Sequence, residues 1–289
     1  MAFEQFDNST GMLAQEFGSI WTKDKLDAVE EYLGAYTKIM KKQTWARLLY
    51  LDAFCGSGTV VPKDGHIIDG SAIRALKYPF TKYYFFDSKK ENTESLRMMI
   101  ESQYPGKTNN VVYANNDSNK LLLSINTPNW KKDGWRGVAF LDPYAMQLNW
   151  SSLECIAKTQ IFDVWYLFPL MALNRMLVRS GDLDRSWQEK IDRFLGTNEW
   201  KNHIYTKSPQ LNIFGEGEYN KVPINDIRDY VLSRFGTIFP TVSQKAAILR
   251  NDMNSPLFLL CFMGSNPSPA AKSASLRVAN HLLSRLDKH

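Results

Sequence analysis

Cysteine and histidine are scarce in this sequence, and neither is arranged as metal ligands or as disulfide partners. The three cysteines, Cys55, Cys155 and Cys261, lie far apart, no C-x-x-C pair occurs, and the four histidines are scattered. Disulfide frameworks need paired cysteines, and zinc sites need closely spaced Cys and His ligands. We therefore expect neither a disulfide-stabilised scaffold nor a bound metal.

Long apolar runs and a basic leader are lacking too. No run approaches the roughly 18 apolar residues that a membrane helix needs. Residues 1–17, MAFEQFDNSTGMLAQEF, include acidic residues but no basic one, whereas a secretory signal has a basic flank and an apolar centre. These absences predict a cytoplasmic protein with no membrane span.

The chain has only a small excess of positive charge. The formal net charge is +5 over 289 residues, and six basic against two acidic side chains give residues 245–289 a charge of +4. An excess of this size does not by itself indicate nucleic-acid binding. We interpret the basic C-terminal stretch as a solvated face.

What the sequence does contain is an alternation of strand and helix patterns. The strand-like segments are residues 47–54, 82–88, 110–115, 137–143 and 160–168. Helical patterns lie between them at 92–104 and 152–159, and an amphipathic helix over 21–43, with Thr22 as its N-cap, precedes them. Such alternation is typical of a parallel sheet with crossover helices. Four aromatic residues in the fifth segment, Phe162, Trp165, Tyr166 and Phe168, fit a strand buried on both faces.

After Phe168 the alternation stops. Two helical patterns, 184–196 and 222–236, flank a polar connector, strand patterns resume at 245–251 and 256–264, and a last helical pattern covers 273–286. The two late strands are close enough to pair antiparallel. We predict an α/β fold: a doubly wound, mainly parallel, Rossmann-like sheet with an antiparallel last strand, an N-terminal helix and a helical insertion. The expected parts are an N-terminal extension (1–47), a core (48–169), an insertion suited to target recognition (170–239), and a final strand pair with the C-terminal helix (240–289).

Two glycines follow the first strand, in LDAFCGSGTV at residues 51–60. A P-loop would end in Lys-Ser or Lys-Thr, but Gly58 is followed by Thr59 and Val60. A dinucleotide fingerprint would have a third glycine or alanine at the start of the helix, and none is present there. The glycines therefore indicate a different nucleotide-like ligand.

Acidic residues at three strand ends favour S-adenosylmethionine, whose ribose diol and amino group suit carboxylates. Asp52 ends the first strand, Asp87 ends the second, and Asp117 follows the third. Open parallel sheets bind their ligands at these carboxyl ends.

The run Asp52-x-Phe54-x-Gly56-x-Gly58 resembles the first motif of class I methyltransferases, in the form found in DNA amino-methyltransferases. That resemblance implies that Phe54 packs on the methionine part of the cofactor and that the glycines let the backbone approach it. It further implies that Asp87 holds the ribose hydroxyls, and that Asp117 and Ser118 meet the adenine.

A second match follows the fourth strand. Asp142-Pro143-Tyr144 resembles the Asp-Pro-Pro-Tyr motif of amino-methyltransferases, with one proline instead of two and with Ala145 in the place of the aromatic residue. By that resemblance, the Asp142 carboxylate and the Pro143 carbonyl accept the two hydrogens of an exocyclic amine, and an aromatic ring stacks on the flipped base. An ordinary strand-end turn is the other interpretation of this tripeptide.

The wider pattern resembles the three-Cys-motif partner proteins. It comprises Trp21-Thr22-Lys23-Asp24-Lys25, the glycine turn, Gly70-Ser71, Leu141 to Tyr144, and the late PLFLLCFMGSNPSP. That family more often has Ala-Gly-Pro-Gly at the glycine turn, and Gly where this chain has Ala145. Between turn and helix lies a loop containing Pro62, Gly65 and Gly70, in which His66 is either a base near the acceptor or a solvated side chain.

We therefore predict an S-adenosylmethionine-dependent methyltransferase that acts on an exocyclic amine of a nucleobase in DNA or RNA. The expected catalytic residues are Asp142, Pro143 and Tyr144, and the expected cofactor-binding residues are Asp52, Phe54, Gly56, Gly58, Asp87, Asp117 and Ser118. The alternative is a catalytically silent module that binds a three-Cys-motif, radical-cofactor-like partner protein.

Overall fold

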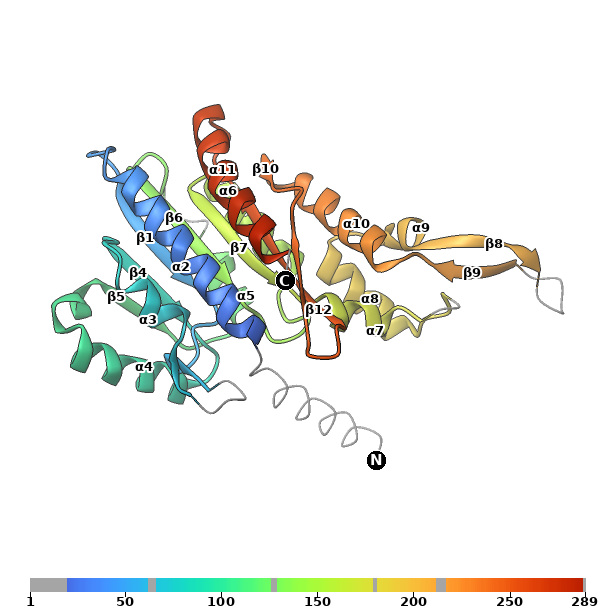
Figure 1. Cartoon of the computed structure of the whole chain (residues 1–289), viewed down its shortest axis with the longest axis horizontal. Coiled ribbons are helices and arrows are strands. Elements are labelled where there is room, and N and C mark those ends of the chain that lie inside the picture. The colour runs from blue at the N-terminus through green and yellow to red at the C-terminus, as the bar shows by residue number, and fades with distance from the viewer. Residues whose placement is uncertain (1–19, 62–65, 126–128, 179–180, 212–216, 288–289) are drawn as a thin grey trace.

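A computed structural model describes residues 20–61, 66–125, 129–178, 181–211 and 217–287 (Figure 1). The expectations for residues 1–17 and for Pro62 and Gly65 lie outside these residues. An eight-stranded sheet forms the centre, in the order β10-β12-β7-β6-β1-β4-β5, with β11 paired to β12. Its strands are β1 (Arg47–Asp52), β4 (Lys82–Phe86), β5 (Val111–Ala114), β6 (Trp135–Leu141), β7 (Phe162–Phe168), β10 (Thr241–Val242), β11 (Ala247–Arg250) and β12 (Pro256–Gly264).

Strand directions confirm the predicted fold class. Strands β5, β4, β1, β6 and β7 are parallel, while β12 is antiparallel to β7, β10 and β11. The five parallel strands and the β11–β12 pair are those expected from the sequence. The short β10 was not predicted, because two residues are too few for a strand pattern.

Each central strand is apolar throughout because both faces of the sheet are covered. In β1, Leu49 and Leu51 pack into the core on one face, while Leu48 and Tyr50 pack into the core on the other. The four aromatic residues of β7 are all buried, which confirms the expected buried strand. One face carries α5 (Ser118–Ser124), α6 (Trp150–Thr159) and the helices of the insertion, and the other carries α2 (Ile20–Met40), α3 (Ser71–Ala75), α4 (Lys90–Gln103) and α11 (Pro269–Leu286).

The insertion contains the expected helices and, in addition, a β-hairpin. Its elements are α7 (Leu170–Met176), α8 (Arg185–Leu195), α9 (Trp200–Ile204), β8 (Tyr205–Leu211), β9 (Gly217–Lys221) and α10 (Ile224–Gly236). The β8–β9 hairpin extends away from the central sheet (Figure 1). The sequence predicted a polar connector here, since residues 205–221 show no apolar alternation.

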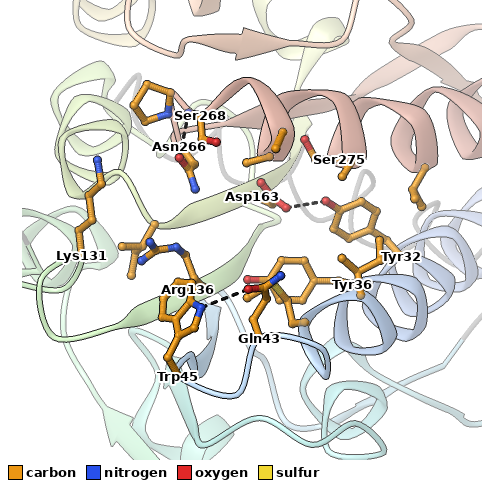
Figure 2. Close-up of a pocket in the computed structure, with 18 residues that line it drawn as sticks. Tyr32, Tyr36, Gln43, Trp45, Lys131, Arg136, Asp163, Asn266, Ser268 and Ser275 are labelled. Atoms are coloured by element: carbon orange, nitrogen blue, oxygen red, sulfur yellow. Dashed lines mark hydrogen bonds between the residues drawn. The ribbon is translucent and has the colours of Figure 1, made fainter.

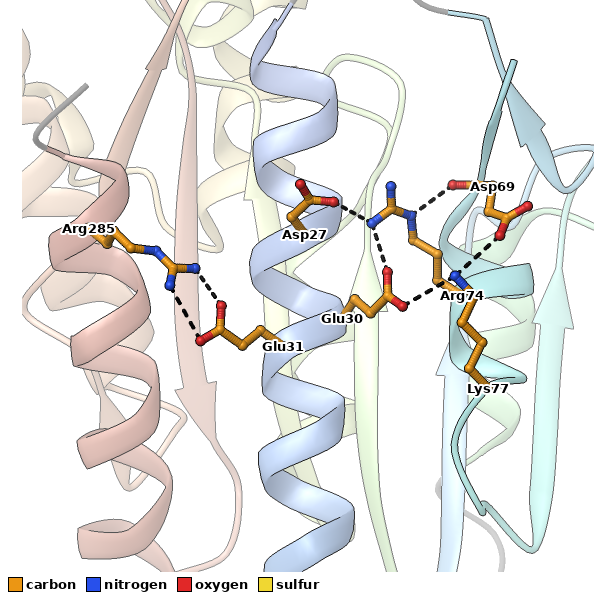
Figure 3. A network of polar contacts seen from close by, with 7 residues as sticks. All are labelled: Asp27, Glu30, Glu31, Asp69, Arg74, Lys77 and Arg285. Carbon is orange, nitrogen blue, oxygen red and sulfur yellow. Dashed lines mark hydrogen bonds and ion pairs between the residues drawn. The ribbon is translucent and has the colours of Figure 1, made fainter. Parts of the chain in front are cut away.

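Helix α2 is fastened on two sides (Figure 3). On one side the Arg74 guanidinium of α3 contacts the carboxylates of Asp27 and Glu30 at 2.6 and 2.8 Å. On the other, Arg285 of α11 contacts Glu31 at 2.5 Å. The predicted N-cap at Thr22 is wrong, because the helix already includes Ile20 and Thr22 lies buried within its first turns.

Candidate functional site

A cavity of about 270 Å³ opens beside the carboxyl ends of β1 and β6 and under the first turns of α2. It brings together six of the predicted site residues: Phe54, Gly56, Gly58, Asp142, Pro143 and Tyr144. Further wall residues come from α2, from the start of α3 and from β12, namely Trp21, Thr22, Lys25, Leu26, Ser71 and Phe258. The predicted residues Asp52, Asp87, Asp117 and Ser118 do not line this cavity.

The glycine turn has the backbone geometry that its sequence implies. Gly56 and Gly58 have φ angles of +60° and +96°, a region that side chains with a Cβ rarely adopt. A Cβ at Gly58 would lie 2.9 Å from Leu96 Cδ1. Instead of a helix, a small hairpin of β2 (Thr59–Val60) and β3 (Ile68–Asp69) follows, and the Gly70 N–H donates to the Gly58 carbonyl at 2.8 Å. The sequence predicted a loop between the glycine turn and the next helix, and in the described residues a short strand pair precedes Gly70 there.

Asp52 supports the turn from below. Its side chain is fully buried, accepts a hydrogen bond from Ser71 Oγ at 2.5 Å and accepts another from the Phe54 N–H at 3.2 Å. Burial raises the pKa of Asp52 to about 7. The carboxyl group therefore joins the end of β1 to the start of α3 and is shielded from any ligand in the cavity.

Asp87 fixes the same turn from the neighbouring strand. Its Oδ2 accepts from the Gly56 N–H at 3.1 Å, and its Oδ1 accepts from the Lys89 N–H at 2.8 Å and from Asn92 Nδ2 at 3.1 Å. The side chain remains partly exposed. Since each carboxylate oxygen has two lone pairs, Oδ2 keeps capacity for a further donor such as a ribose hydroxyl.

Asp117 and Ser118 stand at the start of α5. The Asp117 carboxylate caps that helix by accepting from the Asn119 N–H at 2.7 Å, and it is exposed to solvent. Ser118 is buried and donates its hydroxyl to the Ala53 carbonyl at 2.6 Å. Asp117 is thus accessible at the sheet edge, whereas the Ser118 hydroxyl already has a partner within the chain.

The tripeptide after β6 presents a carboxylate and an aromatic ring to the cavity. Pro143 is buried, while the Asp142 side chain is 27% exposed and Tyr144 is 40% exposed. Ala145 has a φ of +49°, a conformation that favours glycine. It marks a strained backbone directly behind the motif.

Lys25 is the residue that sequence reasoning missed. Its ammonium lies 2.5 Å from Asp142 Oδ2 with a side chain only 8% exposed, and 5.0 Å from the centroid of the Trp21 ring. Trp21 and Lys25 are one helical turn apart, so they share a face of α2. That i,i+4 pair was visible in Trp21-Thr22-Lys23-Asp24-Lys25, but its contact with Asp142, 117 residues away, was not.

Other candidate features contribute less. His66 is exposed and does not line the cavity. Within the described residues, no group of three or more His, Cys, Asp or Glu side chains could hold a metal ion. No helix in the described part of the chain is long and apolar enough to cross a bilayer.

Comparisons with known proteins give the fold. No protein-family model matches the chain, and no curated protein matches it significantly in sequence. Protein LPL1258 from Legionella pneumophila str. Philadelphia 1, associated with family model DUF519, has a similar structure, with a TM-score of 0.50, 13% identity and 94% of both chains covered.

Two more distant structures are the N-terminal domain of EvdMO1 with SAH and D-fucose and the methyltransferase domain of bacterial CtHen1-C. The first has a TM-score of 0.40, 11% identity and 84% and 82% of the two chains covered. The second has a TM-score of 0.38, 13% identity and 82% and 98% coverage. These values are too low to carry an argument about chemistry. Membership of the three-Cys-motif partner family stays a prediction.

Proposed function

We propose that this chain is an S-adenosylmethionine-dependent methyltransferase that acts on an exocyclic amine of a nucleobase in DNA or RNA. The observation that supports it is the meeting of two motifs in one cavity. The glycine turn after β1 and the Asp142-Pro143-Tyr144 tripeptide after β6 form facing walls, although they lie far apart in the sequence.

Two groups of residues fit two different parts of the cofactor. A cavity of about 270 Å³ lies just below the range of about 300–1,000 Å³ typical of ligand pockets, so we assign it to the methionine end and the acceptor. The adenosine would extend over the open sheet edge, where Asp87 is partly exposed and Asp117 is exposed. When bound, the cofactor supplies an electrophilic methyl group.

The chain's own contribution is positioning. Gly56 and Gly58 allow a ligand to approach their backbone without a Cβ in the way. The Asp142 carboxylate and the Pro143 carbonyl accept the amine hydrogens, which directs the nitrogen lone pair toward the methyl carbon, and Tyr144 offers an exposed ring to the base. A reaction of this kind needs alignment and exclusion of water more than side-chain acids or bases.

Calorimetric titration with S-adenosylmethionine tests the cofactor assignment. Wild-type protein should bind, and Asp87→Asn should bind at least about tenfold more weakly, because one charge-assisted hydrogen bond is lost. Asp229→Asn, an exposed carboxylate beside Arg228 on α10, is the matched control and should bind like the wild type. Absence of binding by folded wild-type protein ends the proposal.

Transfer to nucleic acid tests the acceptor assignment. Labelled methyl groups should pass to the amines of a mixed DNA and RNA pool, and Asp142→Ala should abolish transfer while leaving cofactor affinity within about threefold. Label found on oxygen or carbon atoms, or unchanged transfer by Asp142→Ala, would contradict the role given to Asp142.

One observation favours the alternative, a silent module that binds a three-Cys-motif partner protein. The Lys25 ammonium occupies one oxygen of Asp142, so an amine acceptor finds only part of the carboxylate free. The alternative predicts that the protein does not bind the cofactor. It also predicts that substitutions of charged residues on the exposed surface alter partner binding, whereas substitution of Asp142 does not.

A further inference from the structure

A second and larger cavity lies at the opposite edge of the sheet. It has a volume of about 650 Å³ and sits between the end of α2, the start of α11 and the amino ends of β6 and β7 (Figure 2). We call it the distal cavity. Its volume is well inside the range of small-molecule sites, and it shares no lining residue with the candidate site.

Three charged side chains line the distal cavity: Lys131, Arg136 and Asp163. Arg136 precedes Val138 by two residues, and Val138 is the register partner of Asp163 on β7. Both side chains therefore point to the same face of the sheet, yet no ion pair joins them among the described contacts. Each is held by a different partner: Arg136 donates to the Trp135 carbonyl at 2.6 Å and lies over the Trp45 ring at 4.8 Å, and Asp163 Oδ2 accepts from the Tyr32 hydroxyl at 2.7 Å.

Both groups keep unused hydrogen-bonding capacity toward the cavity. A guanidinium has five N–H donors, and one of those on Arg136 has a partner within the described chain. Of the two carboxyl oxygens of Asp163, only Oδ2 has a hydrogen-bond donor among the described residues. Opposite charges in a shared low-dielectric space attract each other strongly. Because Arg136 and Asp163 do not pair with each other, a ligand that carries both charges can pair with each of them.

The Tyr36 hydroxyl offers a further contact in the distal cavity. Tyr36 is 8% exposed, lines the distal cavity, and makes no hydrogen bond with the described residues. Figure 2 shows its hydroxyl directed toward the side of the cavity where Arg136 lies. A tyrosine hydroxyl can donate and accept, so it can bond to a ligand held there.

The remaining walls combine apolar and polar side chains. Lys131, Asn266, Ser268 and Ser275 are polar members of the lining, and the Lys131 ammonium donates to Gln160 Oε1 at 2.7 Å. Ala270, Ala271, Ala274 and Val278 of α11 form one side, and Trp45, 54% exposed, stands at the rim with its indole N–H bonded to Gln43 Oε1 at 3.1 Å. An exposed tryptophan fixed in this way offers a rigid apolar contact.

We propose that the distal cavity binds a zwitterionic small molecule of the α-amino-acid type with an apolar or aromatic side chain. The carboxylate of the ligand pairs with Arg136, its ammonium pairs with Asp163, and its side chain lies along α11 and Trp45. Tyr36 supplies a further hydrogen bond to the ligand's carboxylate. A free phosphate or nucleotide fits less well, because it has no ammonium group to pair with Asp163 and would leave that carboxyl without a partner of opposite charge.

The test uses the full-length protein and the standard protein amino acids, screened by thermal shift and then by calorimetry. At least one apolar or aromatic amino acid should bind. If phenylalanine is such a ligand, N-acetyl-L-phenylalanine, which lacks the positive charge, and L-phenylalaninamide, which lacks the negative one, should each bind about tenfold more weakly or worse.

Two variants assign each charge to its partner. Arg136→Gln should weaken binding of the amino acid, and this variant should bind L-phenylalaninamide no more weakly than phenylalanine. Asp163→Asn should also weaken binding of the amino acid, and it should bind the N-acetyl derivative no more weakly than phenylalanine. In Asp163→Asn the amide oxygen can still accept from Tyr32, so the fold is expected to survive. Arg185→Gln, with a side chain 92% exposed, is the control and should bind like the wild type.

Two results would overturn the proposal. They are no binding by any standard amino acid, and penalties that are the same in both variants as in the wild type. The proposal does not depend on methyl transfer, so its failure and that of the proposed function are separate outcomes.

Discussion

At the scale of single residues, the buried Asp52 and the partly buried Asp163 make the protein sensitive to pH. Burial raises the pKa of Asp52 and of Asp163 to about 7 from an ordinary value of 3.8. A raised pKa means that the folded state binds protons more readily than the unfolded chain. Stability from these groups is therefore fully present below about pH 4 and is lost as the pH rises toward about 7.

We expect Asp52→Asn to flatten this dependence. A pKa shift of about three units corresponds to about 4 kcal/mol of unfolding free energy across the titration. Urea unfolding at about pH 4.5 and about pH 7.5 should show a smaller decrease for Asp52→Asn than for the wild type. Asn can still accept from the Phe54 N–H, so the turn is expected to persist. Equal decreases in both proteins would show that Asp52 does not titrate in this window.

Asp163 gives the distal cavity its own pH dependence. The titratable and charged groups that line the cavity with it are Tyr32 and Tyr36 of α2, Arg136 of β6, and Lys131 from the turn before β6. A bound ammonium favours the ionised carboxyl, so amino-acid affinity should rise between about pH 6 and about pH 8. Calorimetry across that range should show proton release on binding near pH 6.5, and Asp163→Asn should show neither effect.

At the scale of elements, α2 connects the two cavities. In its first turns Lys25 contacts Asp142, and in its later turns Tyr32 and Tyr36 line the distal cavity. Eleven residues separate Lys25 from Tyr36, which at 1.5 Å per residue is about 16 Å along the helix axis. Any displacement of α2 would therefore alter both cavities together.

The two ion-pair groups on α2 should contribute unequally to stability. Arg74 is 8% exposed and contacts two carboxylates, whereas Arg285 and Glu31 are each about half exposed. We expect Arg74→Gln to lower the unfolding free energy by about 1–3 kcal/mol and Arg285→Gln to lower it by less than about 1 kcal/mol. Urea titrations of both variants give the comparison, and equal losses would contradict it.

Elements with strong patterns were predictable, and those that depend on distant contacts were not. Strands β1, β6 and β7 are apolar because helices cover both faces, so their sequences alone identified them. Asp163 lies within the apolar run of β7, and the local sequence does not show that its side chain lines a cavity. The contact of Lys25 with Asp142 and the distal cavity both depend on how α2 packs over strand ends that are far away in the sequence, so neither could be predicted from a local pattern.

At the scale of the whole molecule, the β8–β9 hairpin is the part least involved in the core. It extends from the insertion, while buried Trp200 and Ile204 hold its base against the sheet domain. Under the proposed function, an element that projects in this way is suited to reading the substrate beyond the acceptor base. Thr206 and Asn220 are cross-strand partners, so the hairpin can be shortened at that point without changing the strands below.

We predict that replacing residues 207–219 by Asn-Gly, which forms a two-residue turn between Thr206 and Asn220 and keeps their pairing, separates folding from recognition. Two-residue turns of this kind close hairpins without strain, so the unfolding free energy should change by less than about 1 kcal/mol. Cofactor affinity should also be kept, because none of the described residues of this segment lines the candidate site. Methyl transfer to nucleic acid should fall at least about tenfold through a higher KM, whereas kcat should be kept, since the groups around Asp142 are untouched. Unchanged transfer would assign recognition to the core instead, and a loss of kcat alone would mean that the hairpin contributes to alignment at Asp142.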